Sequence, residues 1–389
     1  MRRSARSSLI ELALVNLKLG TIAFGGPAAH IAMFEDEVVR RRGWLTREQF
    51  LDYLGAANLI PGPSSTEMAI FVGQARAGRA GLVVAGACFI LPAALLVGAL
   101  AWAYTRIGTL PVTEGLLYGV KPVVIAVVLQ ALWRLGKSAL KGPSLVVVGL
   151  AAAAANALGG NELAVLAGAG FVSVLLASLS AHRRRLGDPP SGEPTLRALG
   201  LPVIPLGVAA TTAGGAGLGA LFLVFLKIGA TVFGSGYVLL SFLHADMVMR
   251  HHWLTESQLL DAVAVGQVTP GPVFTTATFI GYLVGGVPGA MVATAGIFLP
   301  GFLLVAVSGP LVTRLRRSTV AGAALDGVNV GALALMAVVT GRLGRAALVD
   351  VWTVLLTVVS VALLLRYRVN AAWLVLGGAV AGVFGIGRL

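Results

Sequence analysis

Long apolar runs without a charged residue are the feature that most limits what this chain can fold into. Residues 81–104 form one such run and residues 355–365 another, and neither alternates between apolar and polar positions as a barrel strand would. Of the 389 residues, 57% are hydrophobic and only 12% are charged, which leaves too little polar side chain to cover a water-soluble surface. The sequence therefore predicts an all-α polytopic membrane protein with room for about ten to twelve transmembrane helices.

Net charge and cysteine content limit the classes of partner and of chemistry that this chain can have. The formal net charge is +13, which in a membrane protein suits cytoplasmic loops, anionic lipid headgroups or an anionic substrate rather than nucleic acid. The single cysteine, Cys88, excludes an intramolecular disulfide, and the five histidines form no metal-binding motif. Gly136-Lys137-Ser138 resembles the end of a nucleotide-binding loop, but residue 131 is Ala where the first glycine is required. We therefore expect no cofactor and no ATP-driven transport.

The first half of the chain reappears in the second half at a shift of 209 residues, so that Lys18 aligns with Lys227. Trp44-Leu45-Thr46 aligns with Trp253-Leu254-Thr255, and further along the shift becomes 208, where Arg134 aligns with Arg342. Composition does not explain this match, because the shared residues are Lys, Trp, Gly and Pro rather than the abundant Ala and Val. The sequence predicts two homologous transmembrane modules, residues 1–180 and 199–389, joined by a polar cytoplasmic linker at residues 181–198.

Basic residues fall at different ends of the matched segments in the two copies. One end carries Arg40, Arg41, Arg42, Arg47, Arg76 and Arg79 in the first copy against Arg250 alone in the second, and another carries Arg314, Arg316 and Arg317 in the second copy against Arg106 alone in the first. Because Lys and Arg concentrate on the cytoplasmic side, this change of bias predicts inverted-topology repeats. The Arg residues at the N-terminus do not fit that scheme directly: either the first apolar segment is re-entrant, or the positive-inside rule is violated there.

Helix-breaking residues interrupt the apolar segments at matched positions. Pro61-Gly62-Pro63 and Pro270-Gly271-Pro272 each separate two segments that are too short to cross a membrane alone, and Phe24-Gly25-Gly26-Pro27 and Phe233-Gly234-Ser235-Gly236 interrupt earlier runs. Paired, interrupted segments of this kind are the best sequence pointer to the binding site of a transporter. We expect broken or re-entrant helices at the Pro-Gly-Pro turns, with free N–H groups that bind an anion. A tight turn that touches no ligand is the alternative.

Polar side chains beside these breaks complete a candidate substrate-binding site. Lys18 and Lys227 are cations inside apolar segments, so they should face protein or a water-filled cavity, although Lys18 could also extend toward the N-terminal side. Glu67 has no acidic counterpart in the second copy and is the candidate for proton coupling or for pairing with Lys18. The candidate binding residues are Lys18, Gly25, Gly26, Asn58, Pro61, Gly62, Pro63, Ser64, Ser65, Thr66, Lys227, Gly234, Ser235, Gln267, Pro270, Gly271, Pro272 and Thr275.

The two Trp-Leu-Thr elements are best interpreted as the starts of helices. Thr46 with Gln49, and Thr255 with Gln258, have the spacing of a capping box, which predicts that a helix starts just after each threonine.

Together these motifs resemble the chromate ion transporter family in its long, two-module form. The resemblance covers essentially the whole chain. It rests on Lys18 through Phe24-Gly25-Gly26-Pro27, on the Trp-Leu-Thr and Pro-Gly-Pro elements of both copies, and on Phe298-Leu299-Pro300. It implies a multi-pass protein of the bacterial inner membrane that exports chromate by the proton motive force, and a transporter rather than an enzyme.

Other functions stay open on the residues alone. A carrier for sulfate or another oxyanion, including one that works in uptake, would need the same cationic site. A membrane-embedded enzyme acting on a lipid phosphate would use Glu67 as acid or base, but it needs a nucleophile or a metal cluster nearby, and the sequence offers none. Glycine spacings at Gly115/Gly119 and Gly327/Gly331 permit a homodimer.

Overall fold

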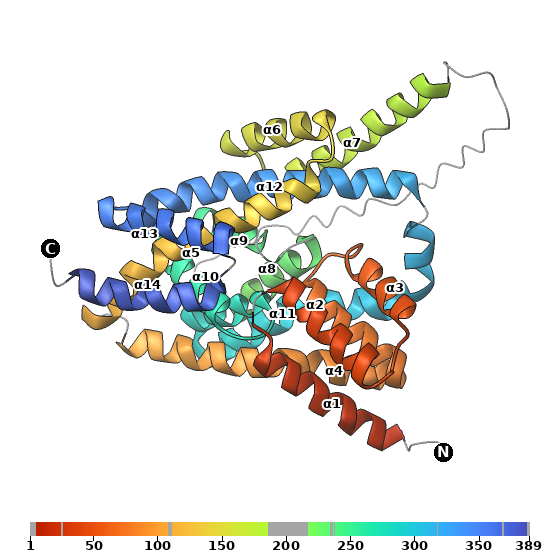
Figure 1. Cartoon of the computed structure of the whole chain (residues 1–389), viewed down its shortest axis with the longest axis horizontal. Coiled ribbons are helices and arrows are strands. Elements are labelled where there is room, and N and C mark those ends of the chain that lie inside the picture. The colour runs from red at the N-terminus through yellow and green to blue at the C-terminus, as the bar shows by residue number, and fades with distance from the viewer. Residues whose placement is uncertain are drawn as a thin grey trace.

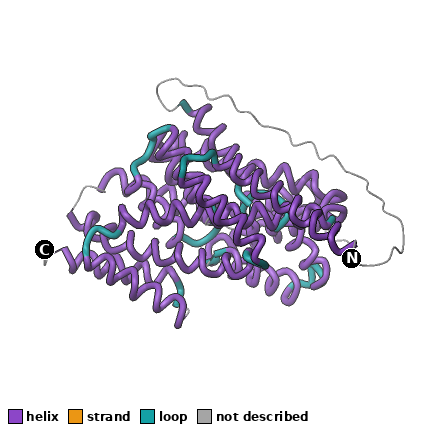
Figure 2. The backbone as a smooth tube through the Cα atoms, turned by 90° about the horizontal axis from the view of Figure 1, so that it is seen from above, coloured by secondary structure: helices purple, strands orange, loops and turns teal. Residues whose placement is uncertain are grey.

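The described parts of the chain form a bundle of helices, most of them joined by short loops (Figures 1 and 2). The computed structural model describes residues 5–24, 26–107, 111–185, 217–233, 236, 238–316, 318–367 and 369–386, and all regular secondary structure within them is helical. The predicted all-α class is therefore confirmed. Among the described residues, five helices are long and apolar enough to span a membrane alone, fewer than the ten to twelve expected, and four apolar helices are shorter. The difference arises because breaks divide several apolar segments into pieces.

The second half of the chain repeats the order of elements found in the first half. The first half consists of α1 (Ala5–Ile22), α2 (Pro27–Glu35), η1 (Asp36–Arg41), α3 (Arg47–Ala57), α4 (Ser64–Ile107), α5 (Pro111–Ala139), α6 (Pro143–Ala157) and α7 (Glu162–Arg185). The second half consists of α8 (Leu218–Thr231), α9 (Leu239–Leu243), η2 (His244–Arg250), α10 (Glu256–Val268), η3 (Val273–Thr275), α11 (Thr276–Arg316), α12 (Thr319–Ala347), α13 (Val351–Ala362), η4 (Leu363–Tyr367) and α14 (Ala371–Ile386). Even the π-helical turns η1 and η2 correspond, so the duplication extends to secondary structure.

The longest helix of each half bends sharply at the same place. In α4 the bend lies at Gly78, with φ 62° and ψ −146°, and in α11 it lies at Gly286, with φ 61° and ψ −150°. This left-handed conformation strains any residue that carries a Cβ, which explains the glycine. The two arms on either side of each bend pack closely through small residues, as where Gly73 lies against the backbone of Gly81.

The capping boxes expected from the sequence are both present. The Thr46 hydroxyl accepts the Gln49 N–H at 3.2 Å, and the Gln49 side chain accepts the Thr46 N–H at 3.0 Å. Thr255 and Gln258 form the same pair of bonds at 3.2 and 2.9 Å. These bonds fix the starts of α3 and α10, the helices that lead into the two Pro-Gly-Pro turns.

The two halves interlock rather than pack as separate bodies. In Figure 1, α6 and α7 of the first half lie along α12 of the second, while α13 and α14 of the second half lie against α5 of the first. Glycines allow the close approach: Gly119 faces the backbone of Gly378 and Gly382, and Gly327 faces that of Ala169. The glycine spacings that permitted a homodimer are thus used for contacts within one chain, and they no longer support a dimer.

The linker expected at residues 181–198 falls mostly outside the described residues. Helix α7 continues to Arg185, five residues into that range, and residues 186–216 are not among those described. The module boundaries around the linker stay a prediction.

The packing between the halves is reciprocal, because the last two helices of each half pack against a long helix of the other half. A two-fold relation between the halves requires such reciprocity. An axis in the membrane plane, which gives inverted repeats, and an axis along the membrane normal, which gives parallel repeats, both satisfy it. The inverted orientation therefore stays a prediction.

Labelling of matched positions tests the orientation. Glu48 and Ser257 are exposed equivalents near the starts of α3 and α10, so each can be replaced by cysteine in a Cys88→Ala background. We expect an impermeant maleimide to modify Glu48→Cys and Ser257→Cys from opposite sides of the membrane, as read in right-side-out and inverted vesicles. Modification of both from one side contradicts the inverted arrangement and supports a parallel duplication.

The contact between α5 and α14 predicts a position-specific intolerance of side chains. A Cβ at Gly119 would lie 2.7 Å from the backbone nitrogen of Gly382, whereas a Cβ at Gly168, also inside a helix, would meet no atom within 4 Å. We expect Gly119→Ala to lower the free energy of unfolding by about 1–3 kcal/mol through overpacking. Gly168→Ala should keep the wild-type melting temperature or raise it slightly, since Ala favours helix. Equal melting temperatures for the two variants in detergent would show that the α5–α14 contact is looser than described.

Candidate functional site

The first helix of each half ends where the sequence predicts a break. Helix α1 ends at Ile22, and α2 begins at Pro27, which suits the first helical position because it has no N–H to satisfy. Gly26 caps α2 with φ 80° and ψ −174°, a conformation that favours glycine. In the second half, α8 ends at Thr231 and α9 begins at Leu239. Three predicted site residues in these breaks, Gly25, Gly234 and Ser235, lie outside the described residues.

Both Pro-Gly-Pro sequences form turns with a glycine at positive φ. The φ angle is 135° at Gly62 and 92° at Gly271. Helix α4 begins directly after the first turn, whereas the second leads through the short 3₁₀ helix η3 into α11. The prolines flanking Gly62 and Gly271 have no N–H, so the glycine carries the one backbone donor of each Pro-Gly-Pro sequence.

Each turn bonds to the helix break of the other module. The Gly62 N–H donates to the carbonyl of Val232, which follows α8, at 2.8 Å. The Gly271 N–H donates to the carbonyl of Ala23, which follows α1, at 2.9 Å. The two bonds join matched positions, since Ala23 aligns with Val232 and Gly62 with Gly271. We call them the Gly62 junction and the Gly271 junction.

The hydroxyl groups after the turns are buried. Ser64, Ser65, Thr66 and Thr275 are each at most 5% exposed. The Thr275 hydroxyl donates to the carbonyl of Pro272 at 2.8 Å, and the N–H groups of Thr66 and Glu67 donate to that of Pro63 as the first bonds of α4. The structure thus places these predicted residues inside the packed bundle, and they do not line the cavity described below.

Lys18 lies in an ion cluster within its own module. Its ammonium is 3.2 Å from Glu37, and the Arg42 guanidinium is 2.7 Å from the same carboxylate. The hydrogen bond from Arg42 is the largest influence that holds the pKa of Glu37 below its usual value, followed in the same direction by Lys18, while burial opposes it. The Lys18 side chain is 50% exposed, consistent with a lysine that extends toward an edge of the bundle.

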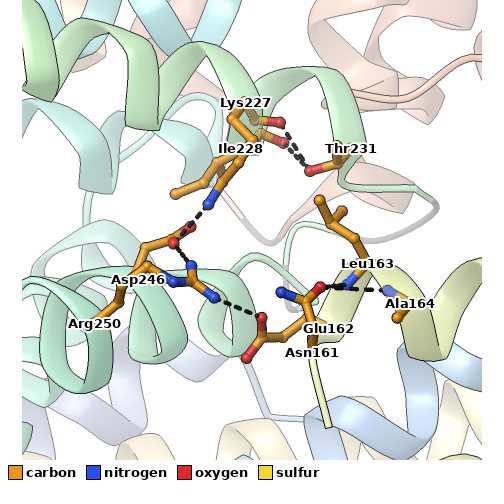
Figure 3. Close-up of polar contacts among 9 residues, drawn as sticks. All are labelled: Asn161, Glu162, Leu163, Ala164, Lys227, Ile228, Thr231, Asp246 and Arg250. Carbon is orange, nitrogen blue, oxygen red and sulfur yellow. Dashed lines mark hydrogen bonds and ion pairs between the residues drawn. The ribbon is translucent and has the colours of Figure 1, made fainter. Parts of the chain in front are cut away.

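Lys227 has an acidic partner at the matched position, as Figure 3 shows. Its ammonium is 2.6 Å from Asp246, whose side chain is only 1% exposed, and Arg250 pairs with the same carboxylate. Arg250 also lies 3.4 Å from Glu162 at the start of α7, so this cluster bridges the two modules. Sequence reasoning missed the acid because it follows the helix break, 19 residues beyond the lysine. Lys18 and Glu37 have the same separation, which is a signal that the repeat itself offered.

A cavity of about 640 Å³ opens where the first break meets the second turn, a volume within the range of roughly 300–1,000 Å³ typical of ligand sites. Its walls come from α1–α2, the turn around Gly271, the C-terminal half of α5, and the η4–α14 segment. Of the predicted site residues, Gly26, Gln267 and Gly271 line it. Neither Lys18 nor Lys227 does, and Asn58, the match of Gln267, is exposed at the end of α3.

The polar lining of this cavity is cationic and rich in donors. It comprises His30, Gln130, Arg134, Lys137, Gln267, Thr269 and Asn370, and no acidic side chain among the described residues lines it. The Lys137 ammonium lies 4.7 Å from the ring centre of Trp133, and Gln130 donates to the carbonyl of Leu364 at 3.1 Å. Buried His30 lies with Nε2 3.0 Å from the Ala23 carbonyl, which also accepts the Gly271 N–H, and its Nδ1 has no partner among the described residues. This arrangement suits a small anion.

The two cations of the cavity were not predicted as site residues. Arg134 stood out only as a marker of the repeat, and Lys137 only as part of an incomplete nucleotide-binding loop. Gln130, Arg134 and Lys137 nevertheless follow the spacing i, i+4, i+7, which is a polar stripe on one face of an otherwise apolar helix. That polar stripe is the sequence pattern from which these two cations could have been predicted as site residues.

The corresponding place in the other half has different side chains. His30 aligns with Leu239, and Asn370 aligns with Glu162, the acid that pairs with Arg250. Arg342, the match of Arg134, acts electrostatically on His244 in a region that also contains Glu162 and Glu256. Cations and acids are therefore interleaved in one half, whereas cations stand without acids along the cavity of the other half.

Comparison with known proteins matches a family model described as chromate transporter to residues 10–174 and again to residues 219–383, once per module. The chain is 33% identical to the chromate transport protein of Cupriavidus metallidurans, over 97% of this chain and 93% of that protein. It is 34% identical to the probable chromate transport protein of Synechococcus elongatus, over 91% and 89% of the two chains, and 32% identical to the chromate transport protein of Pseudomonas aeruginosa, over 94% and 90%. No solved structure matches.

The ion clusters predict how the two lysines differ. Breaking a buried ion pair costs about 3–5 kcal/mol, and we expect Lys227→Met to cost about 2 kcal/mol because Arg250 still contacts Asp246. The double variant Lys227→Met/Asp246→Asn should recover part of that loss. Lys18→Met should cost about 1 kcal/mol or less, because the lysine is half exposed and its buried partner Glu37 keeps the bond to Arg42. Thermal unfolding in detergent measures these differences. An unchanged melting temperature in Lys227→Met, together with weaker chromate binding, would show that this lysine binds the anion and does not only stabilise the fold.

Proposed function

Because the chain belongs to the chromate transporter family, we propose that it exports chromate across the inner membrane of a bacterium and draws on the proton motive force. Family membership supports a multi-pass membrane protein with a chromate transport function. Export, proton coupling and the bacterial inner membrane are the proposed steps beyond it. The observation that carries the proposal is the cationic cavity at the Gly271 junction, whose described lining contains no acidic side chain.

The residues of this cavity fit a tetrahedral dianion such as chromate. The Arg134 guanidinium offers N–H groups in a planar fork that matches two oxygens of an oxyanion, and Lys137 adds a mobile point charge. Gln267 and Asn370 add amide donors. Since no described residue contributes a carboxylate to the lining, the two positive charges are free to balance those of the anion. For this reason the site suits a dianion better than a zwitterion or a cation.

The position of the cavity favours transport over static binding. It lies between the break of one module and the turn of the other, and secondary transporters bind their substrates at such repeat interfaces beside discontinuous helices. Movement of one module against the other would change the side from which this cavity is reached. Lys18 and Lys227 then act as positioning residues. Their ion pairs with Glu37 and Asp246 connect the helix before each break to the segment after it.

The other candidate functions are weaker on the same geometry. Sulfate has the shape and charge of chromate, so a sulfate carrier would use the same cavity and must be distinguished by measurement. A hydrolase acting on a lipid phosphate would need Glu67 to reach its substrate, but Glu67 is fully buried in the bundle. We therefore favour transport over catalysis.

Neutralising the cavity tests the proposal. We expect Arg134→Gln to weaken chromate binding about tenfold or more, since a hydrogen bond to a charged group contributes roughly 1.5–3 kcal/mol. Lys141→Gln is the matched control, because it removes the same charge just beyond α5 from a side chain that is 60% exposed and outside the cavity. It should change binding less than about twofold, as exposed ion pairs contribute little. The measurement is chromate and sulfate flux in proteoliposomes, with and without an imposed pH gradient.

The flux assay also separates the alternatives. Wild-type chromate flux that grows with the pH gradient and falls in Arg134→Gln supports the proposed function. Sulfate transported in preference to chromate assigns the same cavity to a sulfate carrier. Normal flux in both Arg134→Gln and Lys137→Gln would remove the cavity from the transport path.

A further inference from the structure

One buried carboxyl group lies at the other junction, away from the cavity. Glu67, in the first turn of α4, is fully buried, and neither of its carboxyl oxygens has a hydrogen-bond partner among the described residues. A Cβ built on Gly62 would collide with its Oε1, and a Cβ built on Gly301 of α11 would lie 3.9 Å from the same atom. The carboxyl group thus fills the space between the first Pro-Gly-Pro turn and a helix of the other module, beside the Gly62–Val232 bond.

No charge in the surroundings compensates an ionised Glu67. The elements that pack on α4 are α1, α2, α3, α10, α11 and η3. Their described titratable groups include Lys18, His30, Asp52, Tyr53, Asp261 and Tyr282, and none of them hydrogen-bonds to this carboxyl group or acts on it electrostatically. Lys18, which the sequence offered as a partner, is bonded to Glu37 instead.

An ionised carboxylate is not stable in a buried position that offers it no hydrogen bond and no compensating charge. Burial of an ionised group without a partner costs far more free energy than burial of the same group in its neutral, protonated form. The packing around Glu67 therefore requires a protonated carboxyl group as long as the Gly62 junction stays closed. Loss of the proton requires the junction to open and admit water or a cation.

The second module has no such requirement at the matched position. Glu67 aligns with Thr276, and the register is fixed by equivalent backbone bonds from Thr66 to Pro63 and from Thr275 to Pro272. The Thr276 hydroxyl donates to the carbonyl of Val273 at 2.8 Å, so it is satisfied within its own helix. The packing of the second turn is then independent of protonation at this position, and the two junctions differ in their response to protons.

We propose that Glu67 is the proton carrier of the transporter and that its protonation controls the closure of the Gly62 junction. This inference rests on the proposed chromate export. In the closed state the carboxyl O–H is intact and sealed from water. When the junction opens toward the cytoplasm, the O–H bond breaks, the electron pair stays on the carboxylate, and the proton passes to cytoplasmic water. A proton taken up from the opposite side restores the neutral group and lets the junction close, so that proton entry accompanies anion exit.

Glu67→Gln tests this role because it keeps the shape of the protonated side chain and removes the proton. We expect pH-gradient-driven accumulation of chromate in inverted vesicles or proteoliposomes to fall at least tenfold. Exchange of labelled for unlabelled chromate without a gradient should stay within about threefold of wild type, because exchange needs no net proton movement. Glu48→Gln, the same change at an exposed acid of α3, is the matched control and should leave both activities unchanged.

Infrared difference spectroscopy gives a second readout that does not depend on transport. The wild-type protein at neutral pH should show the carbonyl stretch of a protonated carboxylic acid, and this band should vanish in Glu67→Gln and persist in Glu48→Gln. Glu67→Asp, which keeps a titratable group, should retain the band and part of the coupled transport. Gradient-driven accumulation that survives in Glu67→Gln, or the absence of the band in wild type, would overturn the inference. A wild-type protein that moves no chromate in either assay would instead refute the proposed function, and the spectrum would still report the protonation of Glu67.

Discussion

A backbone amide inside a membrane must find a partner in the protein, and this requirement organises the structure. Each Pro-Gly-Pro turn has a single free donor, the glycine N–H, and each helix break leaves a carbonyl with no helical partner. The two needs are met across modules, where Gly62 bonds to Val232 and Gly271 bonds to Ala23. A side chain at Gly271 would lie 2.7 Å from the Cβ of Ala93, so the close approach depends on glycine. The cavity lies against one of these bonds, and the Glu67 carboxyl group against the other.

The two junctions share a backbone design but differ in their side chains. At the Gly271 junction, Arg134 and Lys137 line an open space to which no acidic side chain of the described part of the chain contributes. At the corresponding place in the other half, Arg250 is paired with Asp246 and Glu162, and Glu67 lies in the packed interior. Gene duplication supplies two equivalent scaffolds, whereas the proposed anion site and the proposed proton site need only one copy of each set of residues. The sequence differences between the modules are therefore the places where function is expected, and the shared residues are those that the backbone requires.

Sequence reasoning succeeded where the determining interaction is local. The capping boxes at Thr46 and Thr255, and the breaks at Gly26 and the Pro-Gly-Pro turns, follow from a few adjacent residues whose conformational preferences are strong. It failed where the partner lies across a break or in the other module. No local pattern specifies that Lys227 meets Asp246, or that α5 brings its polar stripe to a break more than one hundred residues earlier in the chain. Those contacts depend on the exchange of helices between modules, which hydropathy and repeat analysis do not encode.

In the mechanism proposed above, the separation of Glu67 from the anion cavity would account for coupling without direct contact between proton and anion. The Gly271 junction bounds the anion cavity and the Gly62 junction encloses Glu67, yet both are made from the same two modules. A relative movement of the modules that lengthens one junction must act on the other, since α4 and α11 pack together along their length. In that mechanism, chromate would favour the state in which the cavity is closed around it, whereas the ionised carboxylate would favour the state in which its own junction is open. Each ligand then changes the affinity for the other by the same factor, as thermodynamic linkage requires.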